Sequence, residues 1–204
     1  MLKGYQFRYD VFCLEKQFYD KDYYENFCEI DRYDTASLHF AAIDNAEQVV
    51  GYIRMICESE NGLPIQKQML YSDLPDITGH NTKIAELSRL AIRHECRKHV
   101  TGFYSYHIQL GLYRMVYLSC KNLGITHLCA IMEKSLYNSL KKMKFRFNTI
   151  GPEFDDHGKV APYMGEITRL ESTLLENEFE NSFYPEPDQH PFRTKFVFWG
   201  CLTA

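Results

Sequence analysis

The strongest constraint on how this chain can fold is the apolar run at residues 84–92, which polar residues interrupt. Glu86, Ser88 and Arg89 stand there among isoleucine, leucine and alanine. Alternate residues of a β-strand point to the same face, so the pattern predicts a strand with Glu86 and Ser88 on one side. An isolated buried charge is costly. Glu86 therefore has two possible roles. It is a general base, or it forms an ion pair with Arg54 or Arg89 that only fixes the strand register.

Other short apolar runs and helix-period segments surround this strand in a regular order. We expect strands over residues 38–43, 49–56, 84–92, 125–132 and 145–150, a last strand or a tail anchor over 196–199, and helices over 7–18, 108–123, 135–143 and 167–175. This order predicts an α/β fold, a mixed sheet with helices on its faces. The 204 residues favour one domain. We expect it to span residues 1–165, with residues 166–204 forming a C-terminal helix and tail packed on it.

Composition and charge exclude several classes of protein. The net charge of −4 argues against a dedicated nucleic-acid binder. No run approaches the ~20 apolar residues of a membrane span. Residues 1–10 lack the apolar core of a signal peptide, so we expect a cytoplasmic protein. The seven cysteines form no CxxC pair, which favours reduced, mostly buried thiols over a disulfide framework or a metal site.

Two further groups of charges and one more arginine are candidates for function. The carboxylates Glu29, Asp31 and Asp34 lie within six positions, either in a solvated acidic loop or in a site for a cation such as a substrate ammonium. Arg54 interrupts another apolar strand, where half of a buried salt bridge is the simplest interpretation. Basic residues also cluster, either as solvated faces or as a surface for docking an acidic macromolecule. These are Arg93, Arg97, Lys98, Lys141, Lys142 and Lys144.

Four motifs carry a family resemblance. They are Arg8-x-x-x-Phe12, Glu29-x-Asp31-x-x-Asp34, Val50-Gly51-x-x-Arg54 and Glu86-x-Ser88-Arg89. In order and approximate spacing they resemble the acyl-homoserine-lactone synthases, over about residues 5–150. The second half resembles a sister group, the N-acyl amino acid synthases and the PEP-CTERM/exosortase-associated acyltransferases. The segments concerned are Met132-Glu133-x-Ser135-Leu136 and Phe147-x-x-Ile150-Gly151-Pro152. Phe18 stands where the lactone synthases have tryptophan, which argues against S-adenosylmethionine as the acceptor.

The resemblance implies a GNAT-like acyltransferase fold with a mixed, mostly antiparallel sheet. It also implies an enzyme that moves a long-chain acyl group from acyl-carrier protein to the amine of an amino acid. The acyl-phosphopantetheine of the carrier would be the donor, with acyl-CoA possible and no tightly bound cofactor. The sequence leaves two alternatives: a lactone synthase that uses S-adenosylmethionine, and a non-catalytic GNAT-like protein that sequesters an acylated carrier.

The resemblance also assigns roles to residues. Glu86 would be the base, and Ser88 and Arg89 would complete the catalytic group, with backbone amides near Leu87–Leu90 as oxyanion donors. The basic residues named above would dock the carrier. The substrate-binding residues would be Arg8, Phe12, Phe18, Glu29, Asp31, Asp34 and Arg54.

Overall fold

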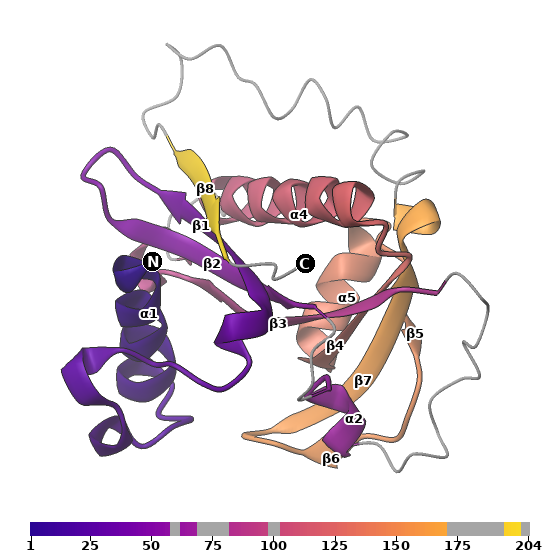
Figure 1. Cartoon of the computed structure of the whole chain (residues 1–204), viewed down its shortest axis with the longest axis horizontal. Coiled ribbons are helices and arrows are strands. Elements are labelled where there is room, and N and C mark those ends of the chain that lie inside the picture. Colours follow the sequence, from indigo (N-terminus) through magenta and orange to yellow (C-terminus); the bar gives the residue numbers. More distant parts are fainter. Residues whose placement is uncertain (58–61, 69–81, 98–102, 171–193, 201–204) are drawn as a thin grey trace. The chain divides into compact units, whose positions relative to one another are not determined.

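The computed structural model describes residues 1–57, 62–68, 82–97, 103–170 and 194–200 (Figure 1). The chain divides into two compact units. Unit 1 takes the described residues of Met1–Arg54, Arg89–Val116 and Asn181–Ala204, and unit 2 takes those of Met55–Ser88 and Tyr117–Glu180. The division of the chain at residue 165 stays a prediction.

Unit 1 begins with a helix that changes its winding. Helix α1 (Leu2–Tyr9) runs into a π-helical segment, η1 (Asp10–Glu15), where the Lys16 amide donates to the Val11 carbonyl at 2.9 Å. The helix expected over residues 7–18 therefore starts earlier and ends earlier. Single helical turns η2 (Lys21–Tyr23), η3 (Glu25–Phe27) and η4 (Asp34–Ala36) lead to the first strand.

The strands of unit 1 follow the order β3-β2-β1-β8. They are β1 (Ser37–Ile43), β2 (Val49–Ile56), β3 (Ile84–Ile92) and β8 (Lys195–Trp199), and β2 and β3 each continue into unit 2. β8 pairs antiparallel with β1, placing Trp199 opposite His39 (Figure 1). The last apolar run is thus a strand and confirms that prediction. The short helix α3 (His94–Arg97) follows β3.

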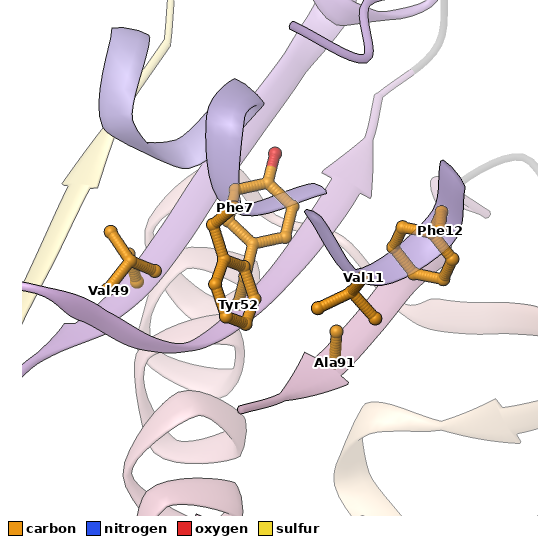
Figure 2. Close-up of a cluster of buried hydrophobic side chains, with 7 residues drawn as sticks. Phe7, Val11, Phe12, Val49, Tyr52 and Ala91 are labelled. Carbon is orange, nitrogen blue, oxygen red and sulfur yellow. The ribbon is translucent and has the colours of Figure 1, made fainter. Parts of the chain in front are cut away.

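Helices cover both faces of β2 in unit 1. Tyr52 packs into a buried cluster with Phe7 of α1 and with Val11 and Phe12 of η1 (Figure 2). At the neighbouring Gly51, an added Cβ would lie 2.3 Å from a side-chain carbon of Ile108 in α4 (Phe103–Leu123). Successive strand residues face opposite sides. The expectation of helices on both faces is therefore confirmed here, and Gly51 permits the close approach of α4.

Unit 2 is built around β4 (His127–Glu133), which pairs parallel with β3 and antiparallel with β7 (Lys159–Glu166). The short strands β5 (Asn148–Thr149) and β6 (Phe154–Asp155) pair antiparallel with β7. Helix α5 (Lys134–Lys142) packs on this sheet, with Tyr137 stacked 4.6 Å from Tyr163. A short helix, α2 (Ile65–Gln68), precedes β3. The sheet is mixed and mostly antiparallel, as expected.

Two predicted elements of unit 2 differ from the structure. The strand expected over residues 145–150 is limited to the two residues of β5. β7, an eight-residue strand, was not anticipated. It contains Pro162 and Gly165, two residue types that argue against an interior strand. The helical segment that begins at Ile167 is described only to Leu170, and the rest of residues 167–175 lies outside the described residues.

Three findings concern the classes of site considered from the sequence. The six cysteines in the described ranges are free thiols. Among the described helices, none combines the length and the apolar character needed to cross a membrane. In the same part of the chain, no three His, Cys, Asp or Glu side chains are arranged to hold a metal ion.

Candidate functional site

Three arginines and three carboxylates of unit 1 form one hydrogen-bonded cluster, named here the charge cluster. The arginines come from α1, β2 and β3, and the carboxylates come from the segment before β1. Sequence analysis singled out every member, and the structure brings all six together. They are Arg8, Arg54, Arg89, Glu29, Asp31 and Asp34.

Arg8 is the buried centre of the charge cluster. Its Nε lies 2.5 Å from Oε2 of Glu29, and its Nη1 lies 2.6 Å from Oδ1 of Asp34. The side chains of Arg8 and Glu29 are both 0% exposed. The guanidinium also lies over the rings of Tyr5 and Tyr52, at 5.3 and 5.8 Å from their centroids. Removal of either charge would break a buried ion pair and leave the other ion with fewer partners in a dry interior.

Arg54 joins the two aspartates. Its two terminal nitrogens bind both oxygens of Asp31, at 2.7 and 2.9 Å, and Nη1 also donates to Asp34 at 2.7 Å. Such two-point contacts fix geometry as well as charge. The interpretation of Arg54 as half of a buried salt bridge is confirmed.

Arg89 and Asp31 form the accessible edge of the charge cluster. Their side chains are 17% and 24% exposed, and Arg89 Nη2 lies 3.2 Å from Asp31 Oδ2. Arg89 also binds both oxygens of Glu29, at 3.0 and 3.1 Å. Its guanidinium stacks over Tyr19 and Phe12, at 4.7 and 5.6 Å. The backbone of Arg89 has φ of +57°, which is uncommon for a residue with a side chain.

The contacts within the charge cluster favour the ionised forms of Asp31, Glu29 and Arg8. Burial alone would raise the pKa of Asp31, but hydrogen bonds and charge from Arg54, with Arg89, lower that pKa to about 2. Burial opposes ionisation of Glu29 as well, and Arg89 and Arg8 together lower its pKa. The pKa of Arg8 is raised, because Tyr52, Glu29 and Asp34 outweigh the effect of its burial. Asp31, Glu29 and Arg8 are therefore ionised at neutral pH.

A cavity of about 570 Å³ lies in the same unit. Its lining residues are Cys13, Leu14, Gln17, Tyr19, Asp20 and Lys21. Tyr19 is shared between this lining and the stack on Arg89. Burial raises the pKa of the Cys13 thiol to about 11, so it is protonated at neutral pH and is a poor nucleophile. The cavity therefore offers space and polar contacts rather than a reactive thiol.

The two predicted aromatic residues lie beside this region. Phe12 is buried under Arg89, and Phe18 is half-buried with its ring centroid 6.5 Å from that of Phe12. The Lys16 ammonium lies 5.0 Å from the Phe18 ring centroid. Both rings thus pack at the edge of the apolar core.

Glu86 and Ser88 lie in unit 2, on β3. Glu86 is 3% exposed, and its Oε2 accepts a hydrogen bond of 2.8 Å from the backbone amide of Ile65 at the start of α2. In the described residues, the pairing of β3 with β4 ends at Glu86 opposite Cys129, although β4 continues along β7 to Glu133. Ser88 is half-buried. Glu86 is thus the buried carboxylate that the sequence pattern predicts.

The predicted carrier-docking residues divide between the two units. In unit 1, Arg93 Nε donates to the Val49 carbonyl at 3.0 Å, and Arg97 forms an ion pair with Glu15. Lys98 lies outside the described residues. In unit 2, the exposed lysines at the end of α5 project from its last turn and the residues that follow. These are Lys141, Lys142 and Lys144.

Sequence analysis missed three side chains that support the charge cluster. Tyr52 lies two residues from Arg54 on β2, so strand periodicity could have placed it on the same face. Its hydroxyl lies 2.6 Å from Nδ1 of the buried His39. Trp199 stacks on His39, with ring centroids 5.6 Å apart and an interplanar angle of 6°. No local signal connects Trp199 to β1, because the pairing of β1 with β8 joins distant parts of the sequence.

Acid should destabilise the protein as the cluster carboxylates take up protons. The pKa of Asp31 is about 2 in the folded state and about 3.9 in an unfolded chain, so the unfolded state binds protons first. The stabilisation from Asp31 is therefore complete above about pH 4 and is lost as the pH falls toward 2. In urea unfolding at pH 5, 4 and 3, the free energy of unfolding of Asp31→Asn should fall less steeply than that of wild type. Equal slopes would contradict the ion pairing of Asp31.

Comparison with known proteins places this geometry in a family context. The acetyltransferase (GNAT) domain family matches residues 7–105. No curated protein sequence matched the chain. Among solved structures, the chain resembles a CoA-dependent acyl-homoserine lactone synthase, BjaI, determined with SAM and isopentyl-CoA. Its TM-score is 0.65 at 19% identity, over 86% of this chain and 80% of that chain.

Two more solved structures share the fold. The acyl-homoserine lactone synthase LasI gives a TM-score of 0.60 at 20% identity, over 81% of this chain and 82% of that chain. FeeM, an N-acyl amino acid synthase from uncultured soil microbes, gives 0.54 at 18% identity, over 68% and 76%. The fold expected from the sequence is confirmed. Residues 7–105 match the acetyltransferase (GNAT) domain family, and the chain shares its fold with these synthases.

Proposed function

We propose that the protein is an N-acyltransferase that moves a long-chain acyl group from acyl-carrier protein to the amine of an amino acid. The observation that carries the proposal is the accessible edge of the charge cluster. There Arg89 and Asp31 lie 3.2 Å apart, and both are held by buried ions. The GNAT domain match supports the acyl-transfer chemistry.

The edge of the charge cluster fits a zwitterionic acceptor. A free amino acid carries one ammonium and one carboxylate, which match Asp31 and Arg89 in sign. If the two residues exchange their mutual contact for contacts with the acceptor, the local charge balance is kept. A bidentate guanidinium suits a carboxylate, and the Tyr19 and Phe12 rings restrict the plane of Arg89. An amine without a carboxylate would leave Arg89 without this new partner.

The reaction requires a base, because an ammonium cannot attack a thioester. We assign this role to Glu86, which would take the proton from the acceptor ammonium directly or through water. The neutral amine attacks the thioester carbon, a C–N bond forms and the C–S bond breaks. As the amide forms, the nitrogen loses a second proton, which the departing thiolate takes to become a free thiol, and the proton held by Glu86 passes to water. Ser88 and the backbone amides near Leu87–Leu90 are proposed to hold the carbonyl oxygen.

In unit 2, the part of β4 that extends beyond its pairing with β3 is a candidate binding site for the phosphopantetheine arm of the acyl donor. A phosphopantetheine arm contains amide groups, which can pair with an exposed strand edge as an extended peptide does. β3 and β4 pair only from Ile84 to Glu86 in the described residues, whereas β4 extends to Glu133. The point at which this pairing ends supports binding of the arm next to Glu86. The same arm occurs in acyl-CoA and in acyl-carrier protein, so the protein surface must decide between them.

A thiol-release assay tests the acceptor class. Acyl-carrier protein or acyl-CoA is mixed with the enzyme and a free amino acid, and the thiol released is measured over time. We expect release to depend on the amino acid and to fall about tenfold or more with the matched amino acid amide, which lacks the carboxylate. Equal rates with both acceptors would contradict recognition of a zwitterion. If the acylated carrier bound without release of thiol, whether or not an amino acid was present, the protein would instead be one that sequesters the carrier.

Charge reversal on α5 tests the carrier. The variant Lys141→Glu/Lys142→Glu should raise the KM for acyl-carrier protein about tenfold, because acidic carriers are steered by local positive charge. The effect should shrink at high salt, since exposed charges are screened beyond about 8 Å at physiological ionic strength. Kinetics with acyl-CoA should change little. Lys121→Glu, at the exposed end of α4, is the control. If the double variant kept full activity with the carrier at every salt concentration, these lysines would have no part in docking and would only form a solvated face of the helix.

A further inference from the structure

We infer that His39 is a positioning residue that couples the C-terminal strand β8 to the charge cluster and thereby sets the affinity for the acceptor. This inference rests on the proposed role of the charge cluster as the acceptor site. His39 is only 1% exposed, and its ring nitrogens contact the Tyr52 hydroxyl and the Asp34 backbone carbonyl rather than the accessible edge of the charge cluster. Its effect on the acceptor must therefore pass through its neighbours.

The hydrogen bonds of His39 have a fixed direction. Its Nε2 lies 3.2 Å from the Asp34 backbone carbonyl, which can only accept, so Nε2 carries the proton. In the neutral ring, Nδ1 then accepts from the Tyr52 hydroxyl at 2.6 Å. Because that hydroxyl donates to His39, its lone pairs remain for Arg8, whose Nη1 lies 3.4 Å away. One neutral tautomer therefore orients Tyr52 toward Arg8 and also holds the backbone of Asp34.

β8 holds the ring of His39 in this position. Trp199 stacks flat on His39 from the opposite strand, and a Cβ added at Gly4 would lie 2.5 Å from the indole. Trp199 thus fills the space between β1 and α1, the helix that carries Arg8. Four segments of unit 1 therefore meet around His39: α1, the segment before β1, β2 and β8.

The electrostatic surroundings favour the neutral ring. Burial, with help from Arg8 of α1 and Arg54 of β2, lowers the pKa of His39 to about 4, although Asp34 acts in the opposite direction. The other groups that face the ring are Tyr5 of α1, Tyr52 of β2 and Trp199 of β8. A protonated ring would donate from both nitrogens, so the Tyr52 hydroxyl would have to turn and give up its orientation toward Arg8.

Kinetics test the coupling to the acceptor. His39→Phe keeps a ring against Trp199 but removes both hydrogen bonds, so the acceptor KM should rise about tenfold while kcat and the donor KM stay within about twofold. Tyr52→Phe should give the same rise, and the double variant should add little to either, because both act through one path. His39→Gln, which can donate to the Asp34 carbonyl, should recover part of the affinity. An acceptor KM that is unchanged in His39→Phe, with only thermal stability lowered, would overturn the inference.

A fluorescence titration tests the same coupling without catalysis. Trp199 is the only tryptophan, and a protonated histidine stacked on it should quench its emission. In wild type we expect quenching with a midpoint near pH 4, where His39 titrates. Tyr52→Phe removes the hydrogen bond that favours the neutral ring, so the midpoint should rise by about one pH unit. An unmoved midpoint would overturn the inference. Failure of wild type to transfer acyl groups would contradict the proposed function. The titration needs no turnover, so it would still show whether Tyr52 and His39 are coupled.

Discussion

Glu86→Gln is expected to lower kcat by about 10²–10⁴-fold, the range that general-base catalysis contributes. Glutamine keeps the size of the side chain and an oxygen that can accept the hydrogen bond from the Ile65 amide. It cannot take a proton from the acceptor ammonium. The free energy of unfolding should therefore stay within about 1 kcal/mol of wild type, as is usual for volume-conserving changes. Steady-state kinetics and urea unfolding of the same samples measure both quantities.

The matched control for this variant is Glu133→Gln in the same unit. Glu133 is an exposed carboxylate at the end of β4 that accepts a hydrogen bond from Ser135. We expect its kcat to stay near wild type. A near-wild-type rate in Glu86→Gln would remove Glu86 as the base. An unfolded Glu86→Gln protein would support the other interpretation of the sequence, in which this carboxylate only fixes the strand.

Arg8→Met should destabilise the protein by about 3–5 kcal/mol, the cost of breaking buried ion pairs by removing the shared partner. Arg8 is 0% exposed and binds both Glu29 and Asp34. In the variant Glu29 would depend on Arg89 alone, while Asp34 would keep Arg54. Such a loss is large compared with the free energy of unfolding of a typical domain, which is about 5–15 kcal/mol. Urea unfolding at pH 7 measures it.

The control for Arg8→Met is an arginine outside the charge cluster. Arg32 is exposed and lies over the Tyr33 ring, at 5.0 Å from its centroid. Arg32→Met should change the free energy of unfolding by about 0.5 kcal/mol or less, as surface substitutions usually do. If Arg8→Met cost no more than Arg32→Met, the charge cluster would contribute nothing to stability. Its role as a rigid support for the acceptor would then be wrong.

The sequence predicted best those elements whose pattern is local. β2 and β3 lie at residues 49–56 and 84–92, where unbroken or regularly interrupted apolar runs mark buried strands. Gly124 ends α4 with φ of +67°, as expected for a helix terminus. β7 could not be found in this way, because Pro162 and Gly165 oppose strand formation and its stability comes from pairing with β4, β5 and β6.

The site was predictable in its residues but not in its connections. Arg54 and Arg89 stand out in the sequence because they interrupt apolar strands, and the three carboxylates because they lie within six positions. Arg8 was singled out through the family resemblance. Which arginine binds which carboxylate depends on tertiary packing. Arg89, which binds Glu29, has an unusual backbone angle and stacks on Tyr19, and neither feature has a local sequence signal. The support from His39 and Trp199 depends on the register of β1 with β8, which the sequence does not specify locally.

The identity of the product tests the central claim most directly. The enzyme is incubated with acyl-carrier protein charged with a long acyl chain, a mixture of amino acids, and S-adenosylmethionine, and the lipid extract is analysed by mass spectrometry. We predict an N-acyl amino acid that forms with wild type and is reduced about 10²–10⁴-fold with Glu86→Gln. An acyl-homoserine lactone formed together with methylthioadenosine would contradict the proposed acceptor. The absence of any acylated amine would contradict the proposed enzyme.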